Sequence, residues 1–358
     1  MNLSELGWDS FFEEGFQQHA ERGLIPARVG KEDRQTYLLL SGTGELSGHI
    51  SGRFLHDARP KGEFPGVGDW VVAQKVPDEQ KAVIHDILPR KSCFARQPPG
   101  GRTEEQVVAA NVDTVFIVNA LDGGRAFNPR RIERYLALAW ESGASPVLVL
   151  NKVDVCPDVD ACMRESEAIA LGIPIHPVSA TEDIGIDLLR EHLRQGETAA
   201  LIGSSGVGKS ALVNALLGTD KQETGAVRED DLRGRHTTVS RELILLPDSG
   251  MIIDTPGMRE LRMWGNESSV SDTFGDIEEL ATQCRFRDCR HQQEPGCAIH
   301  HAIGQGVLDG GRFDSYLRLQ REMAHHASRQ NHKDRLAEKA RGKQLSQMVR
   351  RHCKENRS

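Results

Sequence analysis

The order of four short motifs constrains this chain more than any other feature of its sequence. Residues 203–210, Gly-Ser-Ser-Gly-Val-Gly-Lys-Ser, match the pattern GxxxxGK[ST]. Asn-Lys-Val-Asp at 151–154 and Ser-Ala at 179–180 come before that loop, and Asp-Thr-Pro-Gly at 254–257 comes after it. In most proteins that combine these motifs, the glycine-rich loop comes first. The chain therefore holds the parts of one domain in a circularly permuted order.

The glycine-rich loop has the composition of a phosphate-binding loop. Its three glycines let the backbone curl so that successive N–H groups point toward phosphate oxygens. Lys209 is placed to reach the β- and γ-phosphates, and the Ser210 hydroxyl to coordinate Mg²⁺. The apolar run 198–202 predicts a buried strand before the loop, and residues 210–217 predict a helix after it, whose N-terminus favours anions. An ordinary glycine-rich turn is the alternative, and the strand–loop–helix context argues against it.

The Asn-Lys-Val-Asp motif is predicted to select the base. Asp154 can accept hydrogen bonds from the N1–H and the 2-amino group of guanine, whereas adenine would leave the carboxylate unpaired. Charge-assisted bonds are worth roughly 1.5–3 kcal/mol each, enough to separate GTP from ATP. We expect the Lys152 stem along the base plane and Asn151 to tie this loop to the phosphate loop. The run 146–150 predicts a strand, and ligands of open α/β sheets bind at the carboxyl ends of strands.

The remaining switch elements follow the phosphate loop. Asp254 comes after a short apolar run and is expected to hold Mg²⁺ through water, while the N–H of Gly257 is expected to contact the γ-phosphate. Residues 233–238, Arg-Gly-Arg-His-Thr-Thr, predict a switch loop in which Thr237 or Thr238 completes the Mg²⁺ coordination. The sequence leaves open which threonine does so, and an ordinary mobile surface loop is the alternative for this stretch.

Met258 follows Gly257, at a position where many GTPases have a glutamine that orients the attacking water. A thioether cannot polarise water, so intrinsic hydrolysis is expected to be slow and the catalytic group to come from elsewhere. His236 in the predicted switch loop is the internal candidate, because its pKa range suits proton transfer; the alternative is that it only caps or packs the loop. Lys209 and Gly257, which would contact the γ-phosphate, complete the catalytic candidates.

A second cluster combines three of the seven cysteines with a histidine. It reads Cys284-x4-Cys289-x-His291-x5-Cys297. Three thiolates and one imidazole make a closed tetrahedral zinc site, which is structural because it leaves no position for water. A disulfide is the competing interpretation, but it would leave one cysteine unpaired. The first residues lack the features of a secretory signal, so we expect a reducing cytoplasm, where such clusters bind metal. His300 and His301 are rival fourth ligands.

The net charge of −7 hides an asymmetry along the chain. Residues 318–358 carry twelve Lys/Arg and four Asp/Glu, a net charge of +8, so the rest carries −15. A basic tail on an acidic body suggests an arm for nucleic-acid phosphates, with a solvated helix as the alternative. No apolar stretch approaches the roughly 18–20 residues of a membrane span, so no membrane partner is expected.

The N-terminal part predicts a helix followed by a small barrel. Residues 1–23 carry apolar side chains at the spacing of a short amphipathic helix. Glycine- and proline-rich turns then separate five strand-like runs: Ala27–Val29, Thr36–Leu40, Gly48–Leu55, Asp69–Val76 and Ala82–Leu88. Five strands in this length favour an OB-fold, a class that often binds RNA. Arg53, Lys61 and Lys75 are candidate RNA contacts.

An α/β domain follows a linker at 98–101. Residues 113–120 predict its first strand, and its crossover helices are predicted at 128–143, 159–172 and 186–195. The chain is thus expected to divide into five parts. They are an N-terminal helical extension (1–23), an OB-fold barrel (24–97), a circularly permuted P-loop G domain (98–270), a zinc-binding helical module (271–325) and a basic tail (326–358).

Together these features resemble one known family. The permuted motif order, the Gly-Arg-His-Thr-Thr segment, the Cys/His cluster and the Gly-Asp-Trp strand of the barrel are similar to those of the RsgA (YjeQ) family. Members of that family are GTPases that depend on the small ribosomal subunit. The match covers about residues 24–320. Where many members read GRHTTT, this chain has Val239 in place of the third threonine, which leaves the Mg²⁺-binding threonine open.

The resemblance implies a cytoplasmic protein that binds ribosomal RNA and acts late in maturation of the small subunit, which stimulates its GTP hydrolysis. It implies GTP or GDP as ligand, Mg²⁺ with GTP, and one structural Zn²⁺ held by the cluster; we expect a monomer. The expected GTP-binding residues are Asn151, Lys152, Val153, Asp154, Ser179, Ala180, Gly203, Ser204, Ser205, Gly206, Val207, Gly208, Lys209, Ser210 and Ala211.

Two other functions stay open at this point. One is an RNA-binding assembly protein in which GTP is a structural or regulatory ligand, an interpretation that Met258 supports. The other is an ATP-using kinase, which the Asn-Lys-Val-Asp motif weakens. For a GTPase, the permutation suggests a mechanism. The switch at 254–257 runs straight into the zinc module, so a γ-phosphate that orders the switch is expected to pull on that module.

Overall fold

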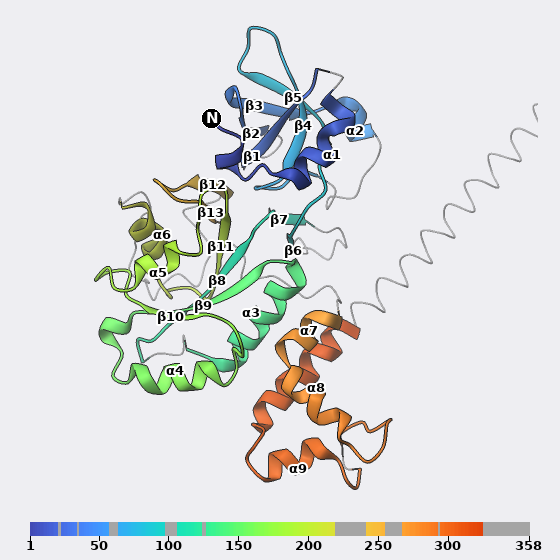
Figure 1. Cartoon of the computed structure of the whole chain (residues 1–358), viewed down its shortest axis with the longest axis vertical. Coiled ribbons are helices and arrows are strands. Elements are labelled where there is room, and N and C mark those ends of the chain that lie inside the picture. Colours follow the sequence, from blue (N-terminus) through green and yellow to red (C-terminus); the bar gives the residue numbers. More distant parts are fainter. Residues whose placement is uncertain are drawn as a thin grey trace, which may run out of the picture. The chain divides into compact units, whose positions relative to one another are not determined.

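The computed structural model describes residues 1–20, 23–33, 36–56, 64–96, 106–123, 127–218, 241–254, 267–292 and 294–324 (Figure 1). The chain separates into two compact units, Met1–Arg262 and Met263–Ser358. Each unit buries its own set of apolar side chains. None of the described helices is long and apolar enough to cross a membrane.

A closed five-stranded barrel forms the N-terminal part of the first unit (Figure 1). Its strands are β1 (Ile25–Asp33), β2 (Thr36–Ser41), β3 (Gly44–Ile50), β4 (Trp70–Lys75) and β5 (Lys81–Ile87). β1 pairs with both β2 and β4, and β5 pairs with β3 and β4, which closes the ring. Val29, Leu39 and Ile84 are among the fully buried side chains of its core. The predicted OB-fold barrel is confirmed.

One predicted strand of the barrel is wrong in its bounds. We expect a strand over Gly48–Leu55, but β3 ends at Ile50 and a short helix, α2 (Gly52–His56), follows. Ser51 explains the change, because its Oγ accepts a hydrogen bond from the N–H of Phe54 at 3.2 Å, a contact typical of a helix N-cap. Phe54 is then buried, so the local cap outweighs the strand-like pattern.

The amphipathic helix predicted at the N-terminus is confirmed as α1 (Ser10–Ala20). It buries Phe12 and Phe16. Trp8, just before the helix, packs against Trp70 of β4 with 4.8 Å between ring centroids. This edge-to-face aromatic contact therefore holds the segment against the barrel.

Six further strands form the sheet of the G domain. They are β8 (Thr114–Ala120), β9 (Ser145–Asn151), β10 (Ile175–Val178), β11 (Thr198–Ile202), β12 (Arg241–Leu245) and β13 (Met251–Asp254). The order across the sheet is β10-β9-β8-β11-β13-β12, with β12 antiparallel and the other pairs parallel. Because β9, β10, β11 and β13 run in one direction, the motifs that follow them meet at one edge of the sheet.

Within the described residues four helices connect these strands, and two of them are shorter than predicted. They are α3 (Pro129–Ser142), α4 (Val159–Glu167), α5 (Ile186–Arg190) and α6 (Lys209–Leu217). α3 begins where predicted, because the Asn128 side chain accepts a hydrogen bond from the N–H of Arg131. It ends at Ser142, because the next residue, Gly143, has a left-handed φ of 87° and caps the helix. α4 and α5 stop early because turns replace their last predicted residues.

β12 is not among the predicted strands, although it contains the short apolar run Leu243–Leu246, and it joins the barrel sheet to the G-domain sheet. It pairs with β1 of the barrel in the register Lys31↔Glu242 and Glu32↔Arg241, which makes one sheet of eleven strands. Arg241 is nearly buried at the junction and contacts a carboxylate oxygen of Glu32 at 3.3 Å. A separate two-stranded sheet, β6 (Cys93–Arg96) and β7 (Gln106–Ala110), lies between the barrel and β8 in the sequence.

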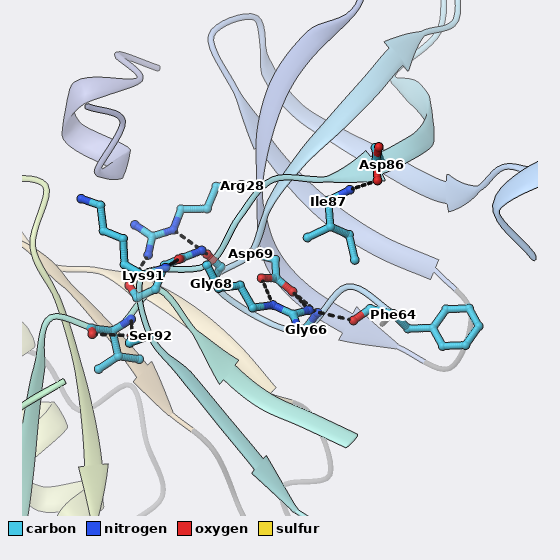
Figure 2. A network of polar contacts seen from close by, with 12 residues as sticks. Arg28, Phe64, Gly66, Gly68, Asp69, Asp86, Ile87, Lys91 and Ser92 are labelled. Carbon is cyan, nitrogen blue, oxygen red and sulfur yellow. Dashed lines mark hydrogen bonds and ion pairs between the residues drawn. The ribbon is translucent and has the colours of Figure 1, made fainter. Parts of the chain in front are cut away.

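Arg28 of β1 ties the barrel to the G-domain sheet from within (Figure 2). Its side chain is 1% exposed. The guanidinium donates to the carbonyls of Leu6 (2.5 Å), Gly68 (3.2 Å) and Asn111 (3.0 Å) and to Oγ1 of Thr198 (2.9 Å). One buried cation thus binds four segments, including the first residue of β11.

The charge of Arg28 is balanced at a distance. Burial lowers the pKa of Arg28 to about 10, and the carboxylates of Asp113 and Asp69 oppose that shift, so the guanidinium stays charged at neutral pH. Asp69 is itself buried and is gripped by the Arg90 fork, with both N–O distances at 2.7 Å. The N–H of Gly66 also donates to Asp69 (Figure 2). The Asp of the Gly-Asp-Trp strand is therefore a structural anchor.

The second unit is helical where it is described. Its helices are α7 (Glu267–Thr273), α8 (Gly275–Thr282) and α9 (Ala298–Gly304), and residues 310–324 are also helical. Phe274, Ile277 and Ile299 are fully buried in its core. Arg312 reaches Asp276 with a two-pronged ion pair at 2.9 and 2.7 Å and ties the last helix to α8. The helical character of the predicted zinc module is confirmed.

Candidate nucleotide site and candidate metal centre

The phosphate loop has the backbone conformation that its glycines predict. Gly203, Gly206 and Gly208 have φ values of 154°, 77° and 94°, which side-chain-bearing residues rarely adopt. A Cβ on Gly203 would lie 2.4 Å from the carbonyl of Val118, and one on Gly208 would lie 2.3 Å from Nδ2 of Asn151. The loop therefore packs too closely against its neighbours for any other residue at these two positions.

Asn151 braces the loop, as predicted. Its Nδ2 donates to the carbonyl of Val207 at 2.9 Å. Its Oδ1 accepts from the N–H of Ala180 at 3.1 Å, so one buried amide joins the phosphate loop to the Ser-Ala segment. Ser179, also buried, stabilises that segment through its Oγ, which accepts from the N–H of Glu182. Three motifs that are far apart in the sequence thus share one hydrogen-bond network.

Two lysines of the site are already fixed by the protein. Lys209 Nζ donates to the carbonyls of Gly203 (2.9 Å) and Ser204 (2.7 Å) across the mouth of the loop. Lys152 has a left-handed φ of 68° and pairs with the carboxylate of Asp122 at 2.7 Å. The two ammonium groups therefore lose less conformational entropy when a ligand binds than free lysines would.

The other residues predicted to bind the base and Mg²⁺ follow strands that end at the same edge of the sheet. Val153 and Asp154 lie in a short 3-10 turn, Val153–Val155, and the carboxylate-bearing residue is exposed. Ser210 and Ala211 are half-buried in the first turn of α6, and Asp254 is half-buried at the end of β13. His236, Thr237, Thr238, Gly257 and Met258 lie outside the described residues, so their predicted roles stay predictions.

Arg131 is a contact of the phosphate loop that the sequence did not reveal. It lies in the first turn of α3, and its Nη1 donates to Oγ of Ser204 at 2.5 Å. Asp122, the partner of Lys152, was missed for the same reason. Both side chains come from the segment after β8, whose residues match no motif and reach the site only through the fold.

The four residues of the predicted zinc cluster come together in the second unit. One potential ligand atom from each of Cys284, Cys289, His291 and Cys297 lies within 4.8 Å of all the others. His291 Nδ1 is 3.6 Å from the sulfur of Cys284 and 3.5 Å from that of Cys297. With Zn–S of about 2.3 Å and Zn–N of about 2.0–2.1 Å, a tetrahedron requires about 3.6 Å between sulfur and nitrogen. The donor set and its spacing therefore fit zinc.

The protein environment supports a thiolate at the cluster. Burial raises the pKa of the Cys284 thiol, but hydrogen bonds from the N–H groups of Ala298 and Ile299, together with those from Cys289 and Cys297, outweigh burial, and the net shift is downward. The two N–H donors belong to the first turn of α9, where a helix favours negative charge. Of the two rival histidines, His300 instead contacts the carbonyl of His291 at 3.0 Å. His291 is the histidine in the cluster.

Comparisons with known proteins agree with this geometry. The model of the RsgA GTPase family matches residues 87–264. An ABC transporter model matches residues 187–350, which include the phosphate loop but not the Asn-Lys-Val-Asp motif. The small ribosomal subunit biogenesis GTPase RsgA of Opitutus terrae is 46% identical over 356 residues, covering 97% of this chain and 96% of the relative. This similarity extends beyond the residues 24–320 on which the sequence resemblance rested.

Solved structures show the same architecture. YjeQ from Thermotoga maritima superposes with a TM-score of 0.61 at 27% identity, over 84% of this chain and 99% of that one. YloQ, described as a circularly permuted GTPase, has a TM-score of 0.60 at 22% identity, over 86% of this chain and 97% of its own, and shares the fold. The identity over nearly the whole chain, together with the permuted order of the motifs, shows that this protein belongs to the RsgA family of GTPases.

Proposed function

We propose that this GTPase binds the small ribosomal subunit and its rRNA and acts late in maturation of that subunit. Hydrolysis of GTP to GDP and phosphate is proposed to be stimulated by the subunit. The observation that carries the proposal is the 46% identity, over 97% of this chain, to a small ribosomal subunit biogenesis GTPase. The ordered phosphate loop and its Asn151 brace support the nucleotide part of the proposal.

The nucleotide site is proposed to work by rigid positioning. Asp154 accepts from the guanine edge, and the loop from Gly203 to Ala211 cradles the phosphates through its N–H groups. Lys209, which already spans the loop, meets the β- and γ-phosphates. Because hydrogen bonds within the protein already hold the phosphate loop and Lys209, little reorganisation of these groups opposes binding.

Magnesium and zinc are proposed to have different roles. Mg²⁺, when bound with GTP, would neutralise charge on the phosphates. Ser210, Asp254 and either Thr237 or Thr238 are the proposed residues that would hold it. Zinc at the Cys/His cluster would contribute folding energy to the second unit rather than chemistry, because four protein ligands leave no position for water.

The loop between the first two cysteines of the cluster supports a contact with RNA. Arg285, Phe286 and Arg287 are exposed there, with Asp288 as the one acidic neighbour within the loop, and Arg290 is exposed directly after Cys289. The Arg285 guanidinium lies 5.5 Å from the centroid of the Phe286 ring. Cations next to an exposed aromatic ring combine phosphate attraction with a face on which a base can stack. The cluster would then hold this loop in shape, in addition to the barrel and the basic tail proposed as RNA contacts.

The test is GTP turnover measured against the concentration of purified small subunits, for the wild type and for His236→Ala. We expect slow turnover by the free protein, because Met258 cannot orient water, and a rise with subunit concentration. Arg164→Ala, an exposed residue of α4 outside the proposed RNA contacts, is the control. A flat wild-type curve, together with subunit binding that depends on the nucleotide, would instead favour the alternative in which GTP is a regulatory ligand.

Equal stimulation of the wild type and His236→Ala would remove His236 from the chemistry and point to a group supplied by the subunit. The proposal also implies a cytoplasmic protein, because small subunits are present there, and a monomer. The five-part division at residues 23, 97, 270 and 325 is part of the same proposal. Gel filtration with light scattering tests the monomer, and limited proteolysis tests the boundaries.

A further inference from the structure

Arg131 is held at two points beside the phosphate loop. Its backbone N–H donates to the side chain of Asn128, the N-cap of α3, at 3.2 Å. Its guanidinium donates to Oγ of Ser204 at 2.5 Å. The helix behind it is anchored by Ile132 and Leu136, both buried. The guanidinium is therefore placed by a rigid helix and not by a mobile loop.

Ser204 receives hydrogen bonds from two cations. Lys209 Nζ donates to its carbonyl at 2.7 Å, and Arg131 donates to its hydroxyl. A guanidinium has five N–H donors, and Ser204 is the side-chain acceptor recorded for Arg131. Within the described part of the chain, Arg131 has no carboxylate partner, unlike its neighbour Arg130, which pairs with Glu133 at 2.7 Å. Its positive charge at the loop is not neutralised there by an ion pair.

We propose that Arg131 is a positioning residue of the nucleotide site that favours ligands with more phosphates. By fixing Ser204, it keeps the N–H groups of the loop directed into the cradle. Its charge, which no ion pair within the described residues neutralises, also adds to the attraction of the loop for the β- and γ-phosphates, and an ordered cation at a half-buried position acts more strongly than one in water. This inference rests on the proposed nucleotide-binding function.

The discriminating measurement is affinity for three ligands that differ only in phosphate number. GMP, GDP and a non-hydrolysable GTP analogue are titrated by competition against a fluorescent guanine nucleotide, for the wild type, Arg131→Ala, Arg131→Lys and Ser204→Ala. For Arg131→Ala we expect an affinity loss of about tenfold for the GTP analogue, the effect of one charge-assisted contact. A smaller loss is expected for GDP, and almost none for GMP. Arg131→Lys keeps the charge and should recover part of the loss.

Salt and a control residue separate charge from structure. The excess loss for the GTP analogue should shrink at high KCl, because screening weakens a charge effect. Arg164→Ala, an exposed arginine of α4, removes the same charge elsewhere in the same unit and should change none of the three affinities. If Arg131→Ala does not fold, Arg131→Lys and Ser204→Ala are compared with the wild type instead. We expect smaller affinity losses for these variants, again largest for the GTP analogue and smallest for GMP.

Equal losses for the three nucleotides would overturn the inference, since they would show a merely structural role. An unchanged affinity for all three would overturn it as well. A wild-type protein that binds none of the three ligands would instead refute the proposed nucleotide-binding function. The failure of the inference and the failure of that function are therefore distinguishable in one experiment.

Discussion

Replacing Arg28 by methionine should destabilise the first unit more than any exposed substitution. Methionine fills much of the volume of the arginine stem but donates no hydrogen bond. Four oxygen acceptors would lose the guanidinium as a donor. The carbonyl of Gly68 keeps a second donor, Nδ2 of Asn111 at 3.1 Å, and the Thr198 hydroxyl can rotate. The carbonyls of Leu6 and Asn111 have no other recorded donor within the described residues.

Each buried acceptor left unpaired costs about 1–3 kcal/mol, so the two carbonyls together predict a loss of about 2–6 kcal/mol. Relief from burying a charge offsets part of this, because the desolvation that lowers the pKa of Arg28 disappears with the guanidinium. We therefore expect a net loss of about 2–4 kcal/mol, a large fraction of the roughly 5–15 kcal/mol that stabilises a typical protein.

Urea unfolding monitored by tryptophan fluorescence measures this loss. Trp8 and Trp70 report on the barrel, and Trp140 reports on α3 of the G domain. We expect a lower midpoint, and a barrel transition that separates from that of the G domain. Arg53→Met, an exposed arginine in α2, is the matched control and should change stability by less than about 0.5 kcal/mol. A loss below about 1 kcal/mol for Arg28→Met would refute the reasoning, since it would show that water replaces the guanidinium.

Three further predictions concern the base, the metal and pH. Asp154→Asn should weaken the affinity for GTP by at least tenfold, because an amide cannot accept both guanine donors. The same variant should bind xanthosine triphosphate more tightly, because the 2-oxo group of that base accepts from the new amide. An unchanged GTP affinity would contradict this prediction. Cys289→Ala should lose one equivalent of zinc and unfold the second unit, seen by metal analysis and circular dichroism; a folded, zinc-free wild type would contradict the metal assignment. The pKa of His176 lies below its ordinary 6.5, mainly because the ring is partly buried and also because His192 lies close to it, with 2.8 Å between the Nε2 atoms. As the pH falls, the unfolded state therefore binds a proton at His176 before the folded state does. Stability should therefore fall as pH drops through 6.5, less steeply in His176→Asn, and identical pH slopes would refute this.

The sequence predicted best what depends on local pattern. Buried parallel strands such as Thr198–Ile202 appear in the sequence as short apolar runs. Because these strands run in the same direction, the motifs that follow them lie at the same edge of the sheet. The cysteine cluster was predicted from its spacing. Arg28, Arg131 and the pairing of β12 with β1 were missed, because each depends on residues far apart in the chain. A single arginine in a strand or helix gives no local signal of what it will contact.

The position of β11, β13 and β12 in the sheet has a consequence for how the protein is made. These three strands lie between β8 on one side and β1 on the other, yet both neighbours are synthesised earlier. A growing chain that has passed β10 would therefore hold two sheet edges with unpaired backbone groups and no phosphate loop. The last three strands close this gap, because β11 pairs with β8 and β12 pairs with β1. Thr198 of β11 then accepts a hydrogen bond from Arg28. Completion of the sheet and completion of the nucleotide site are then the same event, so a chain arrested before residue 254 would be both aggregation-prone and unable to bind GTP.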